Sequence, residues 1–252
     1  MPDSDSTAPE PRISLRGGAE TRDPRLDRVK HFDPRSRNFP IRETRAVEGK
    51  RPRSYAWNFA SGFQGLDQGR SGSCVGFGWA HELAARPAKV PGMTNQFAKE
   101  KIYWQAQKRD PWDGGSYPDA SPNYEGTAVI AGAQVVQKEL GLISEYRWAF
   151  GLNDVILALG YAGPVVLGLD WFEQMMNADS GGFIHPKGDY VGGHCILARG
   201  VDVKRKRVLL RNSWGRWGYK DSGDCYISFD DLAFLLNRDG EACVPSGRKV
   251  AA

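Results

Sequence analysis

The sequence predicts an α+β protein in which a helical lobe precedes a β lobe. Three segments carry helix signals, at residues 73–85, 95–108 and 126–140. Four later segments are short, aliphatic or β-branched, and separated by turn residues, at 164–169, 195–201, 207–211 and 225–229. Helices followed by strands predict lobes of different type, with an antiparallel sheet in the second, and a cleft between two lobes is a usual substrate site.

The first predicted helix begins after Ser73, a good N-cap, and ends at Arg86-Pro87. Gly76 and Gly78 lie inside it, and each costs ~1 kcal/mol relative to alanine in a helix interior. We interpret them as sites of close packing against another element.

The second predicted helix, residues 95–108, carries Phe97, Ile102 and Tyr103 near helical spacing. A loop rich in Pro, Asp, Gly and Ser follows at 109–125, and a loop of this length inside a domain is usually functional. Gly141 ends the third predicted helix.

Residues 1–53 are predicted to form an extended N-terminal arm, because they lack the apolar periodicity of a segment with its own core. Isolated apolar residues such as Leu26 and Val29 are its anchors. We expect the arm to lie on the surface of the folded domain, residues 54–252, or to cover part of its cleft. Within that domain we expect the helical lobe at about 54–160 and the β lobe at about 161–252.

The charge distribution argues against a nucleic-acid-binding protein. Residues 1–53 hold 13 Lys and Arg and 9 Asp and Glu, which accounts for the whole net charge of +4. The basic residues alternate with acidic ones and form no basic face. No apolar run approaches the ~18 residues of a membrane helix, and residues 1–12 lack the order of a secretion signal. We therefore expect a cytoplasmic protein without a membrane partner; its oligomeric state is left open.

The four cysteines are Cys74, Cys195, Cys225 and Cys243, and no two form a C-x-x-C pair. This spacing predicts neither a zinc site nor a thioredoxin-like redox site, and we expect no metal and no cofactor. In an unexported protein we expect mostly free thiols, three of them as small buried residues.

Cys74 differs from the other cysteines because it opens the first predicted helix. Unpaired N–H groups and the helix dipole stabilise a thiolate at this place. Gly69 and Gly72 precede it, and Gln68 could bring its amide to the same point. A thiolate nucleophile also needs a base and donors for the oxyanion of an acyl intermediate. The interpretation requires the sulfur to face an imidazole in an accessible cleft.

The base can be sought among only four histidines. His31 lies in the arm, and His81 is seven residues after Cys74 on the same helix, ~10 Å away along the axis. His185 precedes a proline in a glycine-rich loop. His194 opens an apolar run, where a core strand would hold it firmly, although a lone histidine is more often structural than catalytic.

Asn212 follows the next predicted strand, within Asn212-Ser213-Trp214-Gly215. If the two strands pair in antiparallel fashion, Asn212 lies near His194 and its side-chain oxygen can accept the imidazole N–H. Trp214 can then cover that hydrogen bond from water. Taken alone, the segment is equally a polar turn beside core tryptophans.

Together these segments resemble the papain-like cysteine peptidase family, in the order Cys, His, Asn. Histidine and asparagine follow the cysteine by 120 and 138 residues, against ~130–150 in the family. Gly72-Ser73-Cys74 matches three of the five positions of its cysteine signature, and residues 212–218 match most specifically. The likeness covers roughly residues 55–229 and implies the two-lobed papain-like fold.

By this resemblance Cys74 is the nucleophile, His194 the acid and base, and Asn212 the residue that orients the imidazole. Gln68 and the Cys74 N–H would form the oxyanion hole. The implied reaction is peptide-bond hydrolysis through a thioester acyl-enzyme, on a peptide or protein substrate.

The expected substrate-binding residues are Gly126, Gly193 and Trp214. Gly126 stands where the family has a glycine that pairs with the substrate backbone, and Gly114-Gly115 is a rival for that place. A low pKa of Cys74 would make it the cysteine that iodoacetamide labels fastest at mildly acid pH.

The chain departs from the family pattern at three positions near the site. Val75 replaces an aromatic residue, Ser71 replaces a cysteine, and Gly193 stands where a polar side chain is common. Two alternatives to peptidase therefore stay open. One is transamidation or deamidation by the same three residues, and the other is a catalytically inactive binding module.

Overall fold

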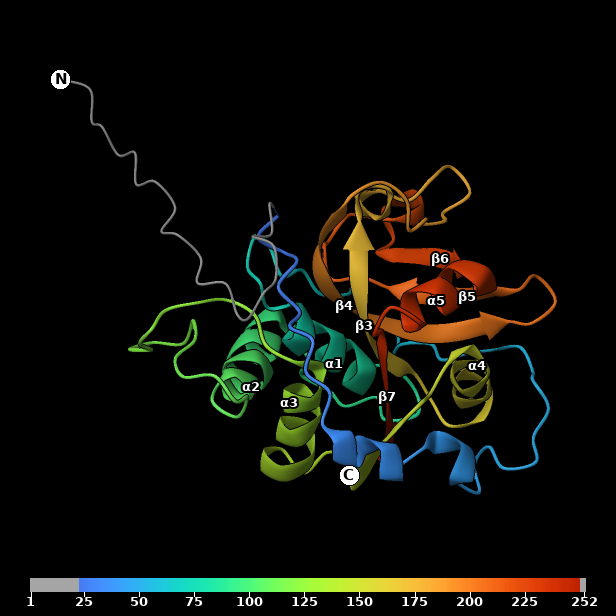
Figure 1. Cartoon of the computed structure of the whole chain (residues 1–252), viewed down its shortest axis with the longest axis horizontal. Helices are drawn as coiled ribbons and strands as arrows, with labels where there is room; N and C mark the ends of the chain where they lie inside the picture. The colour runs from blue at the N-terminus through green and yellow to red at the C-terminus, as the bar shows by residue number, and fades with distance from the viewer. Residues whose placement is uncertain (1–22, 250–252) are drawn as a thin grey trace.

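An antiparallel sheet packs beside a group of helices in the computed structural model, which describes residues 23–249 (Figure 1). The strand order is β2-β7-β3-β4-β5-β6, and β1 pairs with the outer part of β4. The strands are β1 Tyr55–Ala56, β2 Glu145–Trp148, β3 Val165–Phe172, β4 Tyr190–Asp202, β5 Arg207–Arg211, β6 Asp224–Ser228 and β7 Glu241–Ser246. The prediction of an α+β fold is therefore confirmed.

The centre of the sheet is β3, and every one of its eight residues is buried. Its run of aliphatic residues fits a strand covered on both faces. It pairs with β4 in a register that sets Leu169 opposite His194 and Gly168 opposite Cys195. His194 therefore lies inside β4, four residues after its start, whereas the sequence analysis expected it to open the strand.

The helices are α1 Cys74–Ala84, η3 Phe97–Tyr103, α2 Trp104–Gln107, α3 Val129–Gln134, η4 Val135–Glu139, α4 Leu152–Tyr161 and α5 Phe229–Leu236. All eleven residues of α1 are buried, as expected of a helix covered on every side. An added Cβ at Gly76 would lie 2.4 Å from the Ala98 carbonyl oxygen, and one at Gly78 would lie 2.8 Å from the Cys195 sulfur. The predicted close packing of both glycines is confirmed.

Two large apolar cores lie on opposite faces of the sheet, and we call them in turn the helical-lobe core and the β-lobe core. One surrounds α1, α3 and one face of β4, and includes Trp79 and Ile102. The other lies on the opposite side of the sheet and includes Trp171 and Leu210. Helix α4 contributes Val155 to this second core.

The third helix begins at Val129, three residues later than the sequence predicted. Gly126 has φ +100°, which is outside the helical region, and Thr127 forms a bridge with Arg28 of the arm. The pattern also did not predict β2, β7, α4 or α5.

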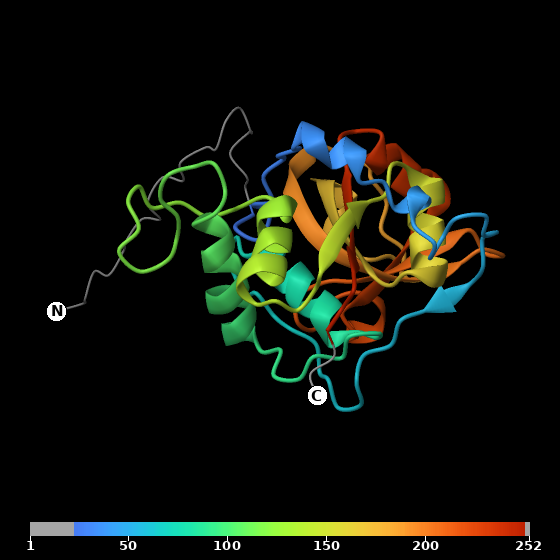
Figure 2. The ribbon, with the colours of Figure 1, turned by 90° about the horizontal axis from the view of Figure 1, so that it is seen from below.

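The described part of the arm, from residue 23 onward, wraps around the domain. It first passes between the helices and the sheet, as the blue trace in Figure 1 shows. Two short helices follow, η1 Pro34–Asn38 and η2 Ile41–Glu43, and Pro40 bridges to Trp148 of β2 (Figure 2). Residues 1–22 and 250–252, with the part of the predicted arm that they contain, lie outside the described residues.

The predicted loop at 109–125 projects from the helical side of the molecule in both views (Figures 1 and 2). Gly115 and Asn123 bridge across it. Across residues 23–249, no helix has both the length and the apolar character that a membrane span requires.

Candidate active site

Cys74 is the first residue of α1, directly after Ser73. Its place at the helix N-terminus is the one that favours a thiolate electrostatically. The neighbouring Gly72 N–H donates to the Glu125 carboxylate, which ties this turn to the loop before α3.

His194 and Asn212 meet across the sheet, as the antiparallel pairing of β4 with β5 predicts. The distance from His194 Nε2 to Asn212 Oδ1 is 2.8 Å. Because an amide oxygen only accepts, Nε2 carries the proton, and Nδ1 of a neutral ring is left as the basic nitrogen. Nδ1 has no hydrogen-bond partner within residues 23–249.

Aromatic rings enclose the imidazole. Trp171 meets it edge to face, with ring centroids 4.7 Å apart, and Trp214 lies 4.8 Å away on another side. Both tryptophans and His194 are almost fully buried, so water is kept from the bond to Asn212.

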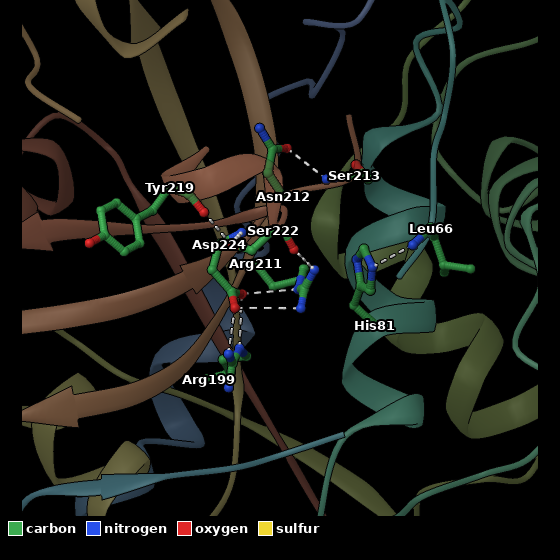
Figure 3. A network of polar contacts seen from close by, with 9 residues as sticks. All are labelled: Leu66, His81, Arg199, Arg211, Asn212, Ser213, Tyr219, Ser222 and Asp224. Carbon is green, nitrogen blue, oxygen red and sulfur yellow. Dashed lines mark hydrogen bonds and ion pairs between the residues drawn. The ribbon is translucent and has the colours of Figure 1, made fainter. Parts of the chain in front are cut away.

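A charged network holds the strand end that carries Asn212 (Figure 3). Asp224 pairs with Arg199 at 2.6 Å and with Arg211 at 3.0 Å, and Arg211 also donates to the Ser222 carbonyl. The Asn212 N–H donates to the Gly223 carbonyl at 2.9 Å. These bonds join β4, β5 and β6 next to the site, and they therefore restrict the position of Asn212.

Gln68 is fixed to the segment that follows Asn212. Its backbone N–H donates to the Ser213 carbonyl at 2.8 Å, and the Ser213 hydroxyl donates to its side-chain oxygen at 2.7 Å. The Gln68 amide nitrogen consequently points the other way and donates to the carbonyls of Ser71 at 2.7 Å and Arg25 at 3.2 Å.

The site contains a piece of the arm, residues 25–29, which we call the strap. The Arg28 N–H donates to the Gly193 carbonyl and the Val29 N–H to the Thr127 carbonyl, each at 3.0 Å. An added Cβ would lie 2.4 Å from the Asp27 carbonyl at Gly126 and 2.2 Å from the Arg28 carbonyl at Gly193. Both positions therefore need glycine for the strap to lie where it does.

The three residues expected to bind substrate all touch the strap. Gly126 and Gly193 lie against its backbone, and Trp214 stacks under the Arg25 guanidinium, 4.1 Å from the ring centroid. The accepting carbonyl beside Gly126 belongs to Thr127, because Gly126 itself is bonded by Tyr103 and Gln107.

Gly114 and Gly115, the alternative to Gly126, make contacts within their own loop. Gly115 bonds the carbonyl of Pro122 within its own loop, and an added Cβ at Gly114 would meet Pro122. Of the two candidates, Gly126 is thus the one that adjoins a peptide backbone in the site.

The strap changes the ionisation of the site. Burial raises the pKa of the Cys74 thiol to about 12, and Asp27 and Arg28 are among the groups that act on it. Burial lowers the pKa of His194 to about 4, although the hydrogen bond with Asn212 opposes this shift. Both groups are therefore neutral near pH 7.

The accessible thiolate expected from the sequence is not present in this state, because Cys74 has no exposed surface. Strap residue Asp27 and strand residue Cys195 both act on the thiol, so the strap is one of the segments that surround it. Rapid labelling of Cys74 by iodoacetamide is accordingly expected only after the strap has moved.

Arg25, Asp27 and Arg28 were not among the site residues predicted from the sequence. The available sequence signal was the two apolar residues beside them, Leu26 and Val29. Leu26 is fully buried in the β-lobe core, and the Val29 N–H donates to the Thr127 carbonyl. Two apolar residues are too few to show a helical or strand period. They therefore do not indicate that the segment lies in a cleft.

The remaining histidines have other surroundings. His81 is buried and accepts a hydrogen bond from the Leu66 N–H at 3.1 Å, and burial lowers its pKa to about 3 (Figure 3). His185 lies between Asp179 and Asp231, and His31 packs on Trp112. All four cysteines are free, and residues 23–249 contain no cluster able to hold a metal ion.

The fold combines helices with an antiparallel sheet, and it places a cysteine at the start of α1 and a histidine inside β4; this arrangement is that of the papain-like fold. Xylellain, a cysteine protease from Xylella fastidiosa, superposes with a TM-score of 0.65 at 16% identity, over 92% of this chain and 99% of that one. A procathepsin B from Trypanosoma congolense gives 0.54 at 13% identity, over 89% and 87%. At such identities the likeness establishes the fold.

One curated relative adds a local sequence match. Over 84 residues the chain is 34% identical to a cathepsin B-like cysteine proteinase of Schistosoma japonicum. The match covers 29% of this chain and only 25% of the relative's length. No family model matches the chain.

Proposed function

We propose that this protein is a cysteine-type peptidase in which Cys74 is the nucleophile, His194 the acid and base, and Asn212 the orienting residue. The observation that carries the proposal is the position of the Arg25 carbonyl. It accepts a hydrogen bond from the Gln68 amide, and three residues further on the Arg28 N–H donates to the carbonyl of Gly193, next to His194. A peptide carbonyl therefore already lies among the groups to which the reaction assigns that place.

The reaction needs each of these groups in turn. The Cys74 thiol gives its proton to His194 Nδ1, and the sulfur attacks the carbonyl carbon of the substrate. The Gln68 amide and the Cys74 N–H stabilise the oxyanion. His194 returns the proton to the departing amine, which leaves a thioester on Cys74. Water, deprotonated by His194, then releases the carboxylic acid and restores the thiol.

Asn212 keeps the ring in the orientation that both proton transfers require. Its oxygen accepts from Nε2 at 2.8 Å, which leaves Nδ1 as the nitrogen that the proposed mechanism uses to accept and return the thiol proton. Trp171 and Trp214 keep this bond dry, which strengthens it.

We further propose that the chain is latent while the strap is in place. The strap fills the positions that a substrate backbone would take along Gly193 and Thr127. It also keeps the thiol and the imidazole neutral through burial. Displacement of residues 25–29 is thus a condition for catalysis. A cytoplasmic location stays a prediction from the sequence.

The test uses the full chain with Arg28→Ala, which loosens the strap, and a mixed peptide library analysed by mass spectrometry. We expect shortened peptides, and none from the Arg28→Ala protein that also carries Cys74→Ala. Full-length peptides with altered glutamine masses would instead indicate deamidation or transamidation. Peptides left unchanged, together with unchanged labelling of Cys74, would contradict the peptidase proposal.

A further inference from the structure

Two basic tracts that are far apart in the sequence meet at one end of the molecule. The first is the last part of the arm, residues 50–53, and the second is the turn between β4 and β5, residues 204–206. The Val203 N–H donates to the Ser54 hydroxyl oxygen at 2.9 Å, and β1 pairs with the outer part of β4. The two tracts therefore adjoin, at the end of the molecule away from α2 (Figures 1 and 2).

Six exposed cations form the surface of this end, which we call the basic face: Lys50, Arg51, Arg53, Lys204, Arg205 and Lys206. Within residues 23–249, Asp202 is the one carboxylate that forms an ion pair with any of them, at 3.2 Å from Arg205. Most of the positive charge on this face is therefore not paired by the described part of the chain. Such a concentration of one sign of charge attracts an acidic partner.

The aromatic rings of the basic face are already occupied by contacts. The Arg53 guanidinium lies 4.1 Å from the ring centroid of Tyr161 and 5.3 Å from that of Tyr55. Tyr55 also packs on Trp57, with ring centroids 4.5 Å apart, and the Tyr161 hydroxyl donates to the Arg51 carbonyl at 2.9 Å. Proteins that bind single-stranded nucleic acid offer free aromatic faces on which bases stack. The basic face offers charge without such a platform, which favours an acidic protein partner.

The turn between β4 and β5 already holds one carboxylate. Asp202 accepts from the Arg205 backbone N–H at 3.1 Å and from its guanidinium at 3.2 Å, and Arg207 Nε lies 3.6 Å away. The neighbouring cations can hold further carboxylates through the same charge-assisted bonds. Tyr55, which is 39% exposed, is the one exposed large apolar side chain in the described part of this end. The face thus lacks the apolar side that binding to a membrane surface uses.

Strand β4 connects the basic face to the candidate catalytic residues. His194 lies inside β4, and the strand continues for eight residues, 202 − 194, to its end at Asp202. At a rise of about 3.3 Å per residue, this end lies about 26 Å from the imidazole along the strand. A substrate chain would need about eight extended residues between the bond that is cut and a segment on the basic face. The face is therefore a surface separate from the cleft.

We propose that the basic face binds a segment of a protein substrate that is rich in aspartate and glutamate, about eight or more residues from the cut. This inference rests on the proposed peptidase function. One exposed ion pair contributes little to affinity, but several formed by the same chain raise it about tenfold. These contacts are the same before and during the reaction, so they lower KM and leave kcat unchanged.

The binding test uses the full-length Cys74→Ala protein and a fluorescein-labelled decapeptide of glutamate, with fluorescence anisotropy as the readout. Arg51→Glu with Lys204→Glu, one change in each tract, should weaken binding about tenfold, and about 0.5 M salt should do the same. Lys101→Glu with Lys138→Glu is the matched control, because both lysines are exposed on the helical side and the net charge changes equally. It should change the affinity by less than about twofold.

The cleavage test uses the full-length Arg28→Ala protein and one cleavable peptide that carries an acidic or a neutral tail of equal length, attached at either end in turn. With a spacer of about eight residues or more, the acidic tail should lower KM about tenfold. An acidic tail directly beside the cut should give no such gain. Arg51→Glu with Lys204→Glu should remove the gain and leave cleavage of the neutral peptide unchanged.

Two results would overturn the inference: an acidic tail without advantage at any spacing, or an advantage that the two substitutions leave intact. If the glutamate peptide binds through the basic face but no peptide is cut, the peptidase proposal fails and the face stands as a site for acidic protein segments. Tighter binding of single-stranded DNA, or of vesicles that contain phosphatidylserine, than of the glutamate peptide would assign the face to another class of partner and reject the proposal.

Discussion

At the scale of single residues, the site depends on one hydrogen bond that is closed off from water. His194 and Asn212 are both buried, and their bond is the acceptor contact that fixes which ring nitrogen is basic. The asparagine oxygen also accepts from the Ser213 N–H at 2.8 Å, so its amide cannot turn over without losing two bonds. Its orientation is therefore determined before any substrate arrives.

Asn212→Ala should lower peptidase activity by about 100-fold, because His194 would lose its orientation for both proton transfers. The same change should lower the free energy of unfolding by about 1–3 kcal/mol, since Nε2 would be left unpaired in a buried place. Steady-state rates with the strap-loosened Arg28→Ala protein and urea denaturation measure the two effects.

Asn153→Ala is the matched control, because that asparagine is exposed on α4. It should change neither quantity appreciably. If Asn212→Ala lost stability in the same degree but kept its full rate, the asparagine would be structural, and the orienting role would be rejected.

The residues that the sequence could identify are those whose type is chemically specific. A cysteine at a helix start, a histidine on a core strand and an asparagine after the next strand were each distinctive. Asp27 and Arg28 were not, because their place in the site depends on bridges to Gly193 and Thr127, which lie far along the chain.

At the scale of elements, the strap makes fewer backbone bridges than a strand within a sheet but more than a free loop. It makes isolated bridges to β4 and to the segment before α3, through Asp27 with Gly193 and Arg28 with Thr127. Directly before these contacts, Leu26 is fully buried in the β-lobe core. A few bridges with one apolar anchor form a segment that can leave without unfolding the domain.

Leu26→Ala should therefore release the strap more often. Removing a buried leucine side chain costs about 2–5 kcal/mol, and every 1.4 kcal/mol that falls on the docked state increases opening tenfold. We expect iodoacetamide to label Cys74 at least tenfold faster in the full-length variant. Peptide mapping of the alkylated cysteines over time measures this.

Phe39→Ala is the control for the arm, because Phe39 is 49% exposed and lies beyond the cleft. Its labelling rate should equal that of the unaltered chain. Labelling of Cys74 that is equally slow in all three proteins would show that something other than the strap protects the thiol.

The elements that the sequence could predict had a clear period or a clear boundary. The helix at 73–85 appears as α1, and the run at 207–211 appears as β5 with the same bounds. The arm had neither, and its composition alone fits a segment that crosses a cleft as well as one that lies on the surface. Only the packing of Leu26 and the bridges to Gly193 and Thr127 decide between them.

At the scale of the whole molecule, the strap contacts both lobes, and its position affects the protonation of Cys74 and His194. With the strap docked, Cys74 and His194 are both neutral, so the thiol carries the one titratable proton of the two groups. Opening would turn them into thiolate and imidazolium, which hold the same single proton. The pair as such therefore contributes no pH dependence to opening near neutral pH, and the effect of either member can be isolated by removing the other.

The protein with Cys74→Ala and Glu241→Gln isolates His194. The second change removes a buried carboxyl group whose pKa burial raises to about 7 and on which Arg28 of the strap acts. With the strap docked, burial holds the pKa of His194 at about 4, below its ordinary value of 6.5. If opening hydrates the ring, the docked state binds fewer protons between these values. The stability of the docked strap should be complete above pH 6.5 and decline as the pH falls toward 4. Asp23 and Arg25, which also act on the ring, leave with the strap.

Hydrogen exchange at the Arg28 and Val29 amides, which donate to Gly193 and Thr127, reports strap opening directly. After correction for intrinsic exchange, we expect protection to fall on the order of tenfold between pH 7 and pH 5. His194→Gln in the same background should flatten this dependence. Protection that stays constant in the first protein, or that falls equally in both, would mean that His194 does not sense the strap. Because the two amides bond to different lobes, unequal losses would further reveal which lobe releases the strap first.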